Sequence, residues 1–108
     1  MIPKTPKPIT SVYVLIYPIL SNVAHRNGYS LFLHGSLNRD LDVFLYPWVS
    51  NCVPIDVMIK EMVDAVSGRI ISATPEQRPF NRKSIGIAFE LDNKIIKSYY
   101  IDLTYVEP

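Results

Sequence analysis

The sequence predicts one α+β domain in which two helices pack on one face of a mainly antiparallel sheet of about five strands. Apolar residues recur with the period of a helix over residues 11–27 and again over 54–67. Shorter apolar runs, bounded by Gly, Pro and Asn, are typical of strands. A chain of 108 residues suits a single core. We therefore expect a flexible arm over 1–9 and a single domain over 10–108.

The first predicted helix follows the proline-rich arm. Thr10 or Ser11 can cap its first turn, and Asn27-Gly28 is a typical stop because glycine accepts the left-handed conformation. Pro18 removes one backbone hydrogen bond inside the helix, which predicts either a kink at Pro18 or a helix that starts afresh near Tyr17. The expected core-facing stripe has helical spacing: Val12, Leu15, Ile16, Ile19, Leu20 and Val23.

The second predicted helix has the most regular apolar pattern. Pro54 suits the first position of a helix, and Gly68 ends it. Its stripe again has helical spacing: Ile55, Met58, Ile59, Met62, Val63 and Val66.

The remaining apolar runs predict strands. The first two are joined by a short polar connection and should form an antiparallel hairpin. A polar loop is expected over 74–83, and Asp92-Asn93 is a turn signal. The expected strands cover 29–34, 40–46, 69–73, 84–91 and 94–106.

Charge and cysteine usage exclude several classes of function. Lys and Arg total 11 and Asp and Glu total 10, a net charge of +1, which argues against a general nucleic-acid ligand. No apolar run is long enough to span a membrane, so no membrane partner is expected. Cys52 is the single cysteine, so no internal disulfide can form. This favours a reducing compartment and predicts a cytoplasmic location.

Three aspartates are the strongest candidates for chemistry. Asp40 and Asp42 share one face of a predicted strand, opposite an apolar face. Asp102 occupies the same kind of position in the last strand and completes a three-carboxylate cluster if the two strands are neighbours. Close carboxylates repel one another unless a cation compensates them. Mg²⁺ suits such a site because it prefers carboxylates combined with phosphate and water.

The motif around these aspartates resembles a known superfamily. Gly35-Ser36 followed by Asp40-Leu41-Asp42, with a later strand aspartate, resembles the core of the nucleotidyltransferases of the DNA polymerase β-like group. The longer string from His34 to Asp42, followed by Pro47-Trp48, is similar to an HGS-x-x-RD-h-D…PW signature carried by a family of small, mostly uncharacterised phage proteins.

The resemblance implies a truncated nucleotidyltransferase-like domain with assigned roles. Gly35 and Ser36 would form a phosphate-binding turn, and Asp40, Asp42 and Asp102 would be the metal ligands and catalytic carboxylates. One departure matters. Only Leu37, Asn38 and Arg39 separate the turn from the aspartates, too few for the helix that holds phosphates in the superfamily.

Basic and aromatic residues complete the candidate site. Arg39 either offers its guanidinium to phosphate or neutralises the aspartates. His34 could donate a hydrogen bond to phosphate, act as a general acid or base, or be a packed ring bonded to the backbone. Arg82 and Lys83, with Arg78, form a basic loop whose charges could meet phosphate in the carboxylate cleft. Candidates for stacking a base are Phe44, Tyr46, Tyr99, Tyr100 and Tyr105.

The leading prediction is a phage nucleotidyltransferase-like protein that binds a nucleotide or other phosphate ligand with Mg²⁺ in the host cytoplasm. One alternative is an active small nucleotidyltransferase. The other is a non-catalytic interaction protein that captures a host factor or a signalling nucleotide. A homo-oligomer and a host protein partner both stay open as alternatives.

Overall fold

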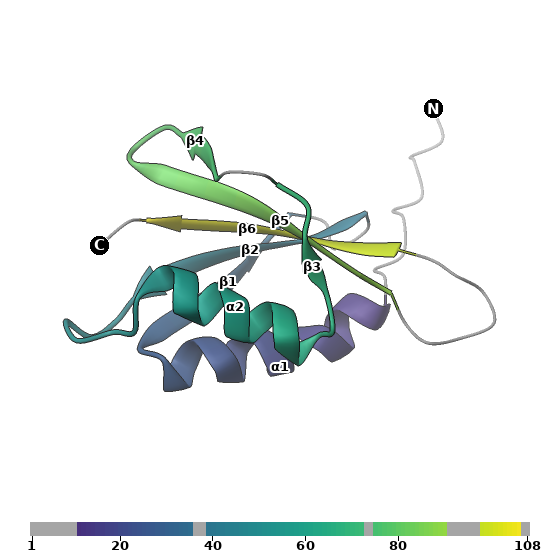
Figure 1. The fold of residues 1–108 in the computed structure, drawn as a ribbon, viewed down its shortest axis with the longest axis horizontal. Coiled ribbons are helices and arrows are strands. Elements are labelled where there is room, and N and C mark those ends of the chain that lie inside the picture. Colours follow the sequence, from purple (N-terminus) through teal and green to yellow (C-terminus); the bar gives the residue numbers. More distant parts are fainter. Residues whose placement is uncertain (1–10, 36–38, 73–74, 91–97, 107–108) are drawn as a thin grey trace, which may run out of the picture.

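The computed structural model describes residues 11–35, 39–72, 75–90 and 98–106, and it has two layers (Figure 1). Two helices cover one face of a six-stranded sheet with the order β1-β2-β6-β5-β3, and β4 pairs with β5. This confirms the predicted α+β class. The elements are α1 (Ser11–Arg26), β1 (Tyr29–His34), β2 (Asp40–Pro47), α2 (Ile55–Ala65), β3 (Arg69–Ile70), β4 (Glu76–Arg78), β5 (Arg82–Glu90) and β6 (Ser98–Val106).

The sheet is mostly antiparallel, with one parallel pair at its centre. β1 and β2 form the predicted antiparallel hairpin, and β5 and β6 are also antiparallel. β2 and β6 run parallel, so the last strand lies beside the strand that carries Asp40 and Asp42. Neither described helix is long and apolar enough to cross a membrane.

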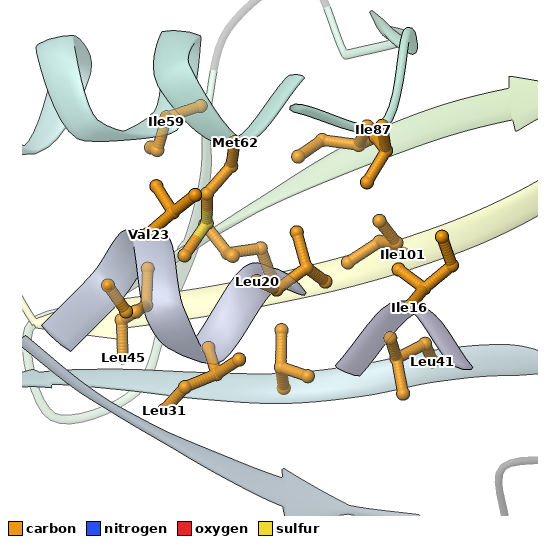
Figure 2. Close-up of a cluster of buried hydrophobic side chains, with 14 of the residues drawn as sticks. Ile16, Leu20, Val23, Leu31, Leu41, Leu45, Ile59, Met62, Ile87 and Ile101 are labelled. Carbon is orange, nitrogen blue, oxygen red and sulfur yellow. The ribbon is translucent and has the colours of Figure 1, made fainter. Parts of the chain in front are cut away.

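The core lies between the helices and one face of the sheet (Figure 2). Leu41 and Leu45 of β2 and Ile101 of β6 are essentially buried, as the alternation of the two strands predicts. Leu20 of α1 and Met62 of α2 pack against them. The opposite face, here called the open face, carries the aspartates.

α1 buries part of the predicted stripe, because Ile16, Leu20 and Val23 lie in the core, but the buried face is shifted toward Tyr13 and Ala24. The helix is continuous from Ser11 to Arg26 through Pro18, so the restart near that proline is wrong. Leu15 and Ile19 are exposed, contrary to prediction, with 72% and 43% of their surface accessible. The helix is apolar on nearly all sides, so its periodicity does not identify one face. The buried residues are Tyr13, Ile16, Leu20, Val23 and Ala24.

α2 follows its predicted span closely. Pro54 is its N-cap residue instead of its first helical residue, and Val66 is its C-cap. Ser67, and not Gly68, takes the left-handed conformation after the helix, with φ of 53°. Gly68 is instead required by close approach, because an added Cβ would lie 2.7 Å from the Ala88 carbonyl oxygen of β5.

The polar loop predicted over 74–83 is wrong. Among the described residues of this segment, 76–78 form β4 and 82–83 begin β5, and the two strands are joined as a β-hairpin. Phe80 and Asn81 turn the chain with φ of 62° and 58°. β3 is shorter than the predicted strand over 69–73.

Several predictions concern residues outside the described part. They are the flexible arm over 1–9, the turn at Asp92-Asn93 and the start of the last strand over 94–97.

Candidate functional site

The open face of β2 and β6 brings two aspartates side by side. Asp42 and Asp102 are register partners on these parallel strands, and neighbouring strands lie about 4.8 Å apart. Asp40 precedes Asp42 by two residues on the same face and is the register partner of Tyr100. The neighbouring side chains of β2 and β6 that face the helices are buried, so alternation directs all three carboxylates to the open face.

The end of β1 closes one side of the pair. His34 is the register partner of Asp42 on the antiparallel side, and its side chain is exposed. Gly35 follows with φ of 79°, and a Cβ at this position would overlap Oδ2 of Asp42. Glycine is therefore required at position 35 for two reasons: the backbone is left-handed, and the Asp42 carboxylate leaves no room for a side chain. Ser36 lies outside the described residues.

The electrostatics of Asp42 reflect this crowding. Partial burial raises the pKa of its carboxyl above 3.8, and repulsion from Asp102 raises that pKa further. Asp40 adds a smaller contribution in the same direction, whereas His34 opposes it by lowering the pKa. Ionised Asp42 is thus an acceptor that a cation or a proton donor can stabilise.

Two arginines of the β4–β5 hairpin face these carboxylates. The hairpin rises from the sheet on the side away from the helices (Figure 1). Arg78 donates from Nε to Oγ of buried Ser84 at 3.0 Å, and Arg82 donates from Nε to the carbonyl oxygen of Pro79 at 2.9 Å. Both guanidinium groups are held by neighbours within their own hairpin.

Arginines and aspartates line one cleft of about 320 Å³, here called the carboxylate cleft. In the described residues, Arg78 pairs with Glu76 at 3.4 Å, and neither Asp42 nor Asp102 takes part in an ion pair. The opposite charges therefore share a cleft without neutralising each other. The lining residues are His34, Asp42, Arg78, Arg82, Asp102 and Thr104.

Two predicted ligand-binding residues lie elsewhere. Arg39 is exposed, its carbonyl oxygen accepts a 2.6 Å hydrogen bond from Tyr13, and it is not among the described residues of the cleft wall. Lys83 alternates with Arg82 and Ser84, and therefore points to the helix face of β5, where its register partner is Tyr105. Tyr99 and Tyr105 also face the helix side, whereas Tyr100 lies on the open face.

The sequence interpretation missed Thr104 and placed Arg78 only in a general basic loop. Thr104 follows Asp102 by two residues, so strand alternation alone could have placed it beside the carboxylates. Arg78 had no comparable signal, because its position depends on a hairpin that the sequence pattern does not reveal.

Asp42 and Asp102 fit part of a magnesium site. Mg²⁺ is commonly held by one or two carboxylates, with phosphate and water as its other ligands, and two half-buried carboxylates lie on adjacent strands here. No group of three His, Cys, Asp or Glu side chains suited to a metal occurs among the described residues. Asp40 therefore does not complete a three-carboxylate site in this arrangement.

Comparison with known proteins adds no assignment. No protein-family model matches the chain, and no curated protein sequence matches it.

Proposed function

We propose that the carboxylate cleft binds a phosphate-bearing ligand together with Mg²⁺. The single observation that carries the proposal is the cleft itself, in which Asp42 and Asp102 share a hollow with Arg78 and Arg82 without forming ion pairs with them. Carboxylates attract a divalent cation, and guanidinium groups bind phosphate oxygens with paired hydrogen bonds.

Each side of the cleft has its own role in this proposal. Asp42 and Asp102 hold the cation, whose charge relieves the repulsion that raises the Asp42 pKa. Arg78 and Arg82 bind the phosphate from the hairpin side. Bound Mg²⁺ would neutralise phosphate charge and orient the phosphate group. Gly35 keeps the Asp42 carboxylate accessible, because any larger residue would overlap it.

The proposal concerns binding and not catalysis. The cleft of about 320 Å³ lies near the lower end of the ~300–1,000 Å³ typical of small-molecule sites. Such a volume suits one phosphate-bearing molecule. The resemblance to nucleotidyltransferases supports the choice of phosphate chemistry.

Calorimetric titration with tripolyphosphate and with ATP tests this proposal. With Mg²⁺ in excess over the ligand, we expect saturable binding that excess EDTA removes. Asp102→Asn and Arg82→Gln should each weaken binding roughly tenfold or more, because each removes a charge-assisted interaction. Thermal melts establish that both variants stay folded.

Lys60→Gln is the matched control for the arginine change. Lys60 is an exposed cation on α2, on the other side of the sheet, so its loss changes the net charge equally without touching the cleft. The proposal is wrong if neither ligand binds at millimolar concentration with Mg²⁺, or if Arg82→Gln has no more effect than Lys60→Gln.

A further inference from the structure

A second hollow, of about 220 Å³, adjoins the carboxylate cleft on the open face, and we call it the aromatic hollow. The two share His34, Arg82 and Thr104, so they are direct neighbours on this face. The residues that line the aromatic hollow are Phe32, Leu33, His34, Phe44, Arg82 and Thr104.

Two phenylalanines form the apolar part of this hollow. Phe32 and Phe44 are register partners on β1 and β2, and Thr104 is the partner of Phe44 on β6. Phe32 keeps 53% of its surface exposed, and Phe44 is half-buried. They lie on the face opposite the hydrophobic core, so packing of the core does not account for them.

We propose that the ligand of the carboxylate cleft is a nucleotide whose base lies on Phe32 and Phe44. This inference rests on the proposed function, because it takes the phosphates to be in the cleft. The aromatic row is two residues further along the strands than the carboxylate row, a separation of about 6.7 Å. In a nucleotide, the sugar likewise separates the base from the phosphate, so one ligand can reach both rows.

Arg82 lies where the two hollows meet. Its guanidinium lies 5.7 Å from the centre of the Phe80 ring, and its Nε is bonded to the Pro79 carbonyl. It lines both hollows. A cation that lines both hollows can bind the phosphate of a ligand whose base lies in the neighbouring aromatic hollow.

The chemistry of the aromatic hollow favours stacking of a base on the rings over hydrogen bonds to the edge of the base. Its phenyl rings offer flat apolar surface, and every base has a flat face that can stack. Binding should therefore depend weakly on base identity, with purines ahead of pyrimidines because purines stack over a larger area.

The test compares ATP with tripolyphosphate, which carries the same number of phosphate groups without base or sugar. In the presence of Mg²⁺, ATP should bind the wild-type protein roughly tenfold or more tightly than tripolyphosphate. Phe44→Leu should reduce ATP affinity toward that of tripolyphosphate while leaving tripolyphosphate binding unchanged. Phe32→Leu provides a second variant if the first melts below the assay temperature.

Tyr46→Leu is the matched control. Tyr46 lies on the same strand and the same face as Phe44, is exposed, and does not line the aromatic hollow. Its replacement should leave both affinities unchanged. Equal wild-type affinities, or an equal loss for both ligands in Phe44→Leu and Phe32→Leu, would overturn the inference while leaving phosphate binding intact. Absence of binding by either ligand would overturn the proposed function and this inference together.

Discussion

Asp42 and Asp102 are direct register partners on parallel strands, although 60 positions separate them in the chain. Each faces away from the core, and each is half-buried. Burial is the largest cause of the raised Asp42 pKa, and repulsion from Asp102 is the second largest. Two like charges in register are unfavourable for folding, so this pair has a measurable cost in the protein without ligand.

The destabilisation of the folded protein by ionised Asp42 should depend on pH. The pKa of Asp42 is raised in the folded state. The native protein therefore binds more protons than the unfolded chain at pH values between 3.8 and this raised pKa. Stability from this group is therefore fully present below pH 3.8 and is lost as pH rises through the folded pKa. Asp42→Asn should increase the melting temperature at pH 7 and have little effect near pH 3. Melting curves by circular dichroism at both values check this, and an equal change at both would contradict it.

The two aspartates should also be energetically coupled. Removing either charge abolishes the same repulsion, so the double variant Asp42→Asn/Asp102→Asn should gain less stability than the sum of the single variants. Coupling between contacting residues is typically about 0.5–3 kcal/mol. Asp64, exposed on α2, supplies the control pair, since Asp42→Asn and Asp64→Asn should add within about 0.5 kcal/mol. Urea unfolding of the six proteins measures both cycles, and additivity of the cleft pair would refute the coupling.

Gly35→Ala should affect both stability and binding. The left-handed backbone costs a non-glycine residue roughly 1–2 kcal/mol, and the methyl group would displace the Asp42 carboxylate. We expect lower stability in urea and weaker Mg²⁺-dependent ATP binding by the folded protein.

Gly28→Ala separates these effects. Gly28 also has a positive φ, of 91°, but its added Cβ would meet Val49 and Cys52. This variant should lose stability and keep its ligand affinity. Loss of affinity in both variants would mean that Gly35 acts on the fold and not on Asp42.

The sequence was most informative where a strand has one apolar and one polar face. Leu41 and Leu45 alternate with Asp40 and Asp42, so both the core and the open face of β2 could be predicted. The same alternation placed Asp102 on the open face of the last strand. That β2 and β6 are neighbours was only a condition of the prediction, because pairing of strands so distant in sequence is a property of the whole fold.

Patterns without such contrast misled the sequence interpretation. α1 is apolar on most sides, so its core face could not be separated from exposed Leu15 and Ile19. β4 has only exposed polar residues and lies between Pro75 and Pro79, which are turn signals. Phe80, with a positive φ, is an unusual turn residue. The hairpin that places Arg78 over the cleft was therefore missed. Lys83 was assigned by charge alone, whereas alternation along β5 directs it to the other face.

The identity of the buried face of α1 can be tested directly. Leu20 is fully buried between the helices and the sheet, whereas Leu15 of the same helix is 72% exposed. Leu20→Ala should cost about 2–5 kcal/mol, as large-to-small core substitutions do. Leu15→Ala should change stability by no more than about 0.5 kcal/mol. Urea unfolding curves measure both, and similar losses would contradict the orientation of the helix.

Tyr13 connects α1 to the strand ends that precede the carboxylate pair. Its hydroxyl donates to the Arg39 carbonyl oxygen at 2.6 Å and accepts from the Tyr100 amide at 3.1 Å. Burial raises the pKa of this buried phenol, and the nearby Asp40 adds to that effect. Tyr13→Phe removes both hydrogen bonds and leaves two backbone groups without this partner, so it should cost about 1–3 kcal/mol.

Tyr17→Phe is the control for Tyr13. Its hydroxyl donates a single 2.9 Å bond to the Leu31 carbonyl oxygen from a half-buried position, so water can replace it at a cost of about 1 kcal/mol. Native-state hydrogen exchange gives the sharper readout. Exchange of the Tyr100 amide should accelerate in Tyr13→Phe beyond what its global stability loss explains, because that amide loses its acceptor. Unchanged relative protection at Tyr100 would show that the hydroxyl does not anchor β6.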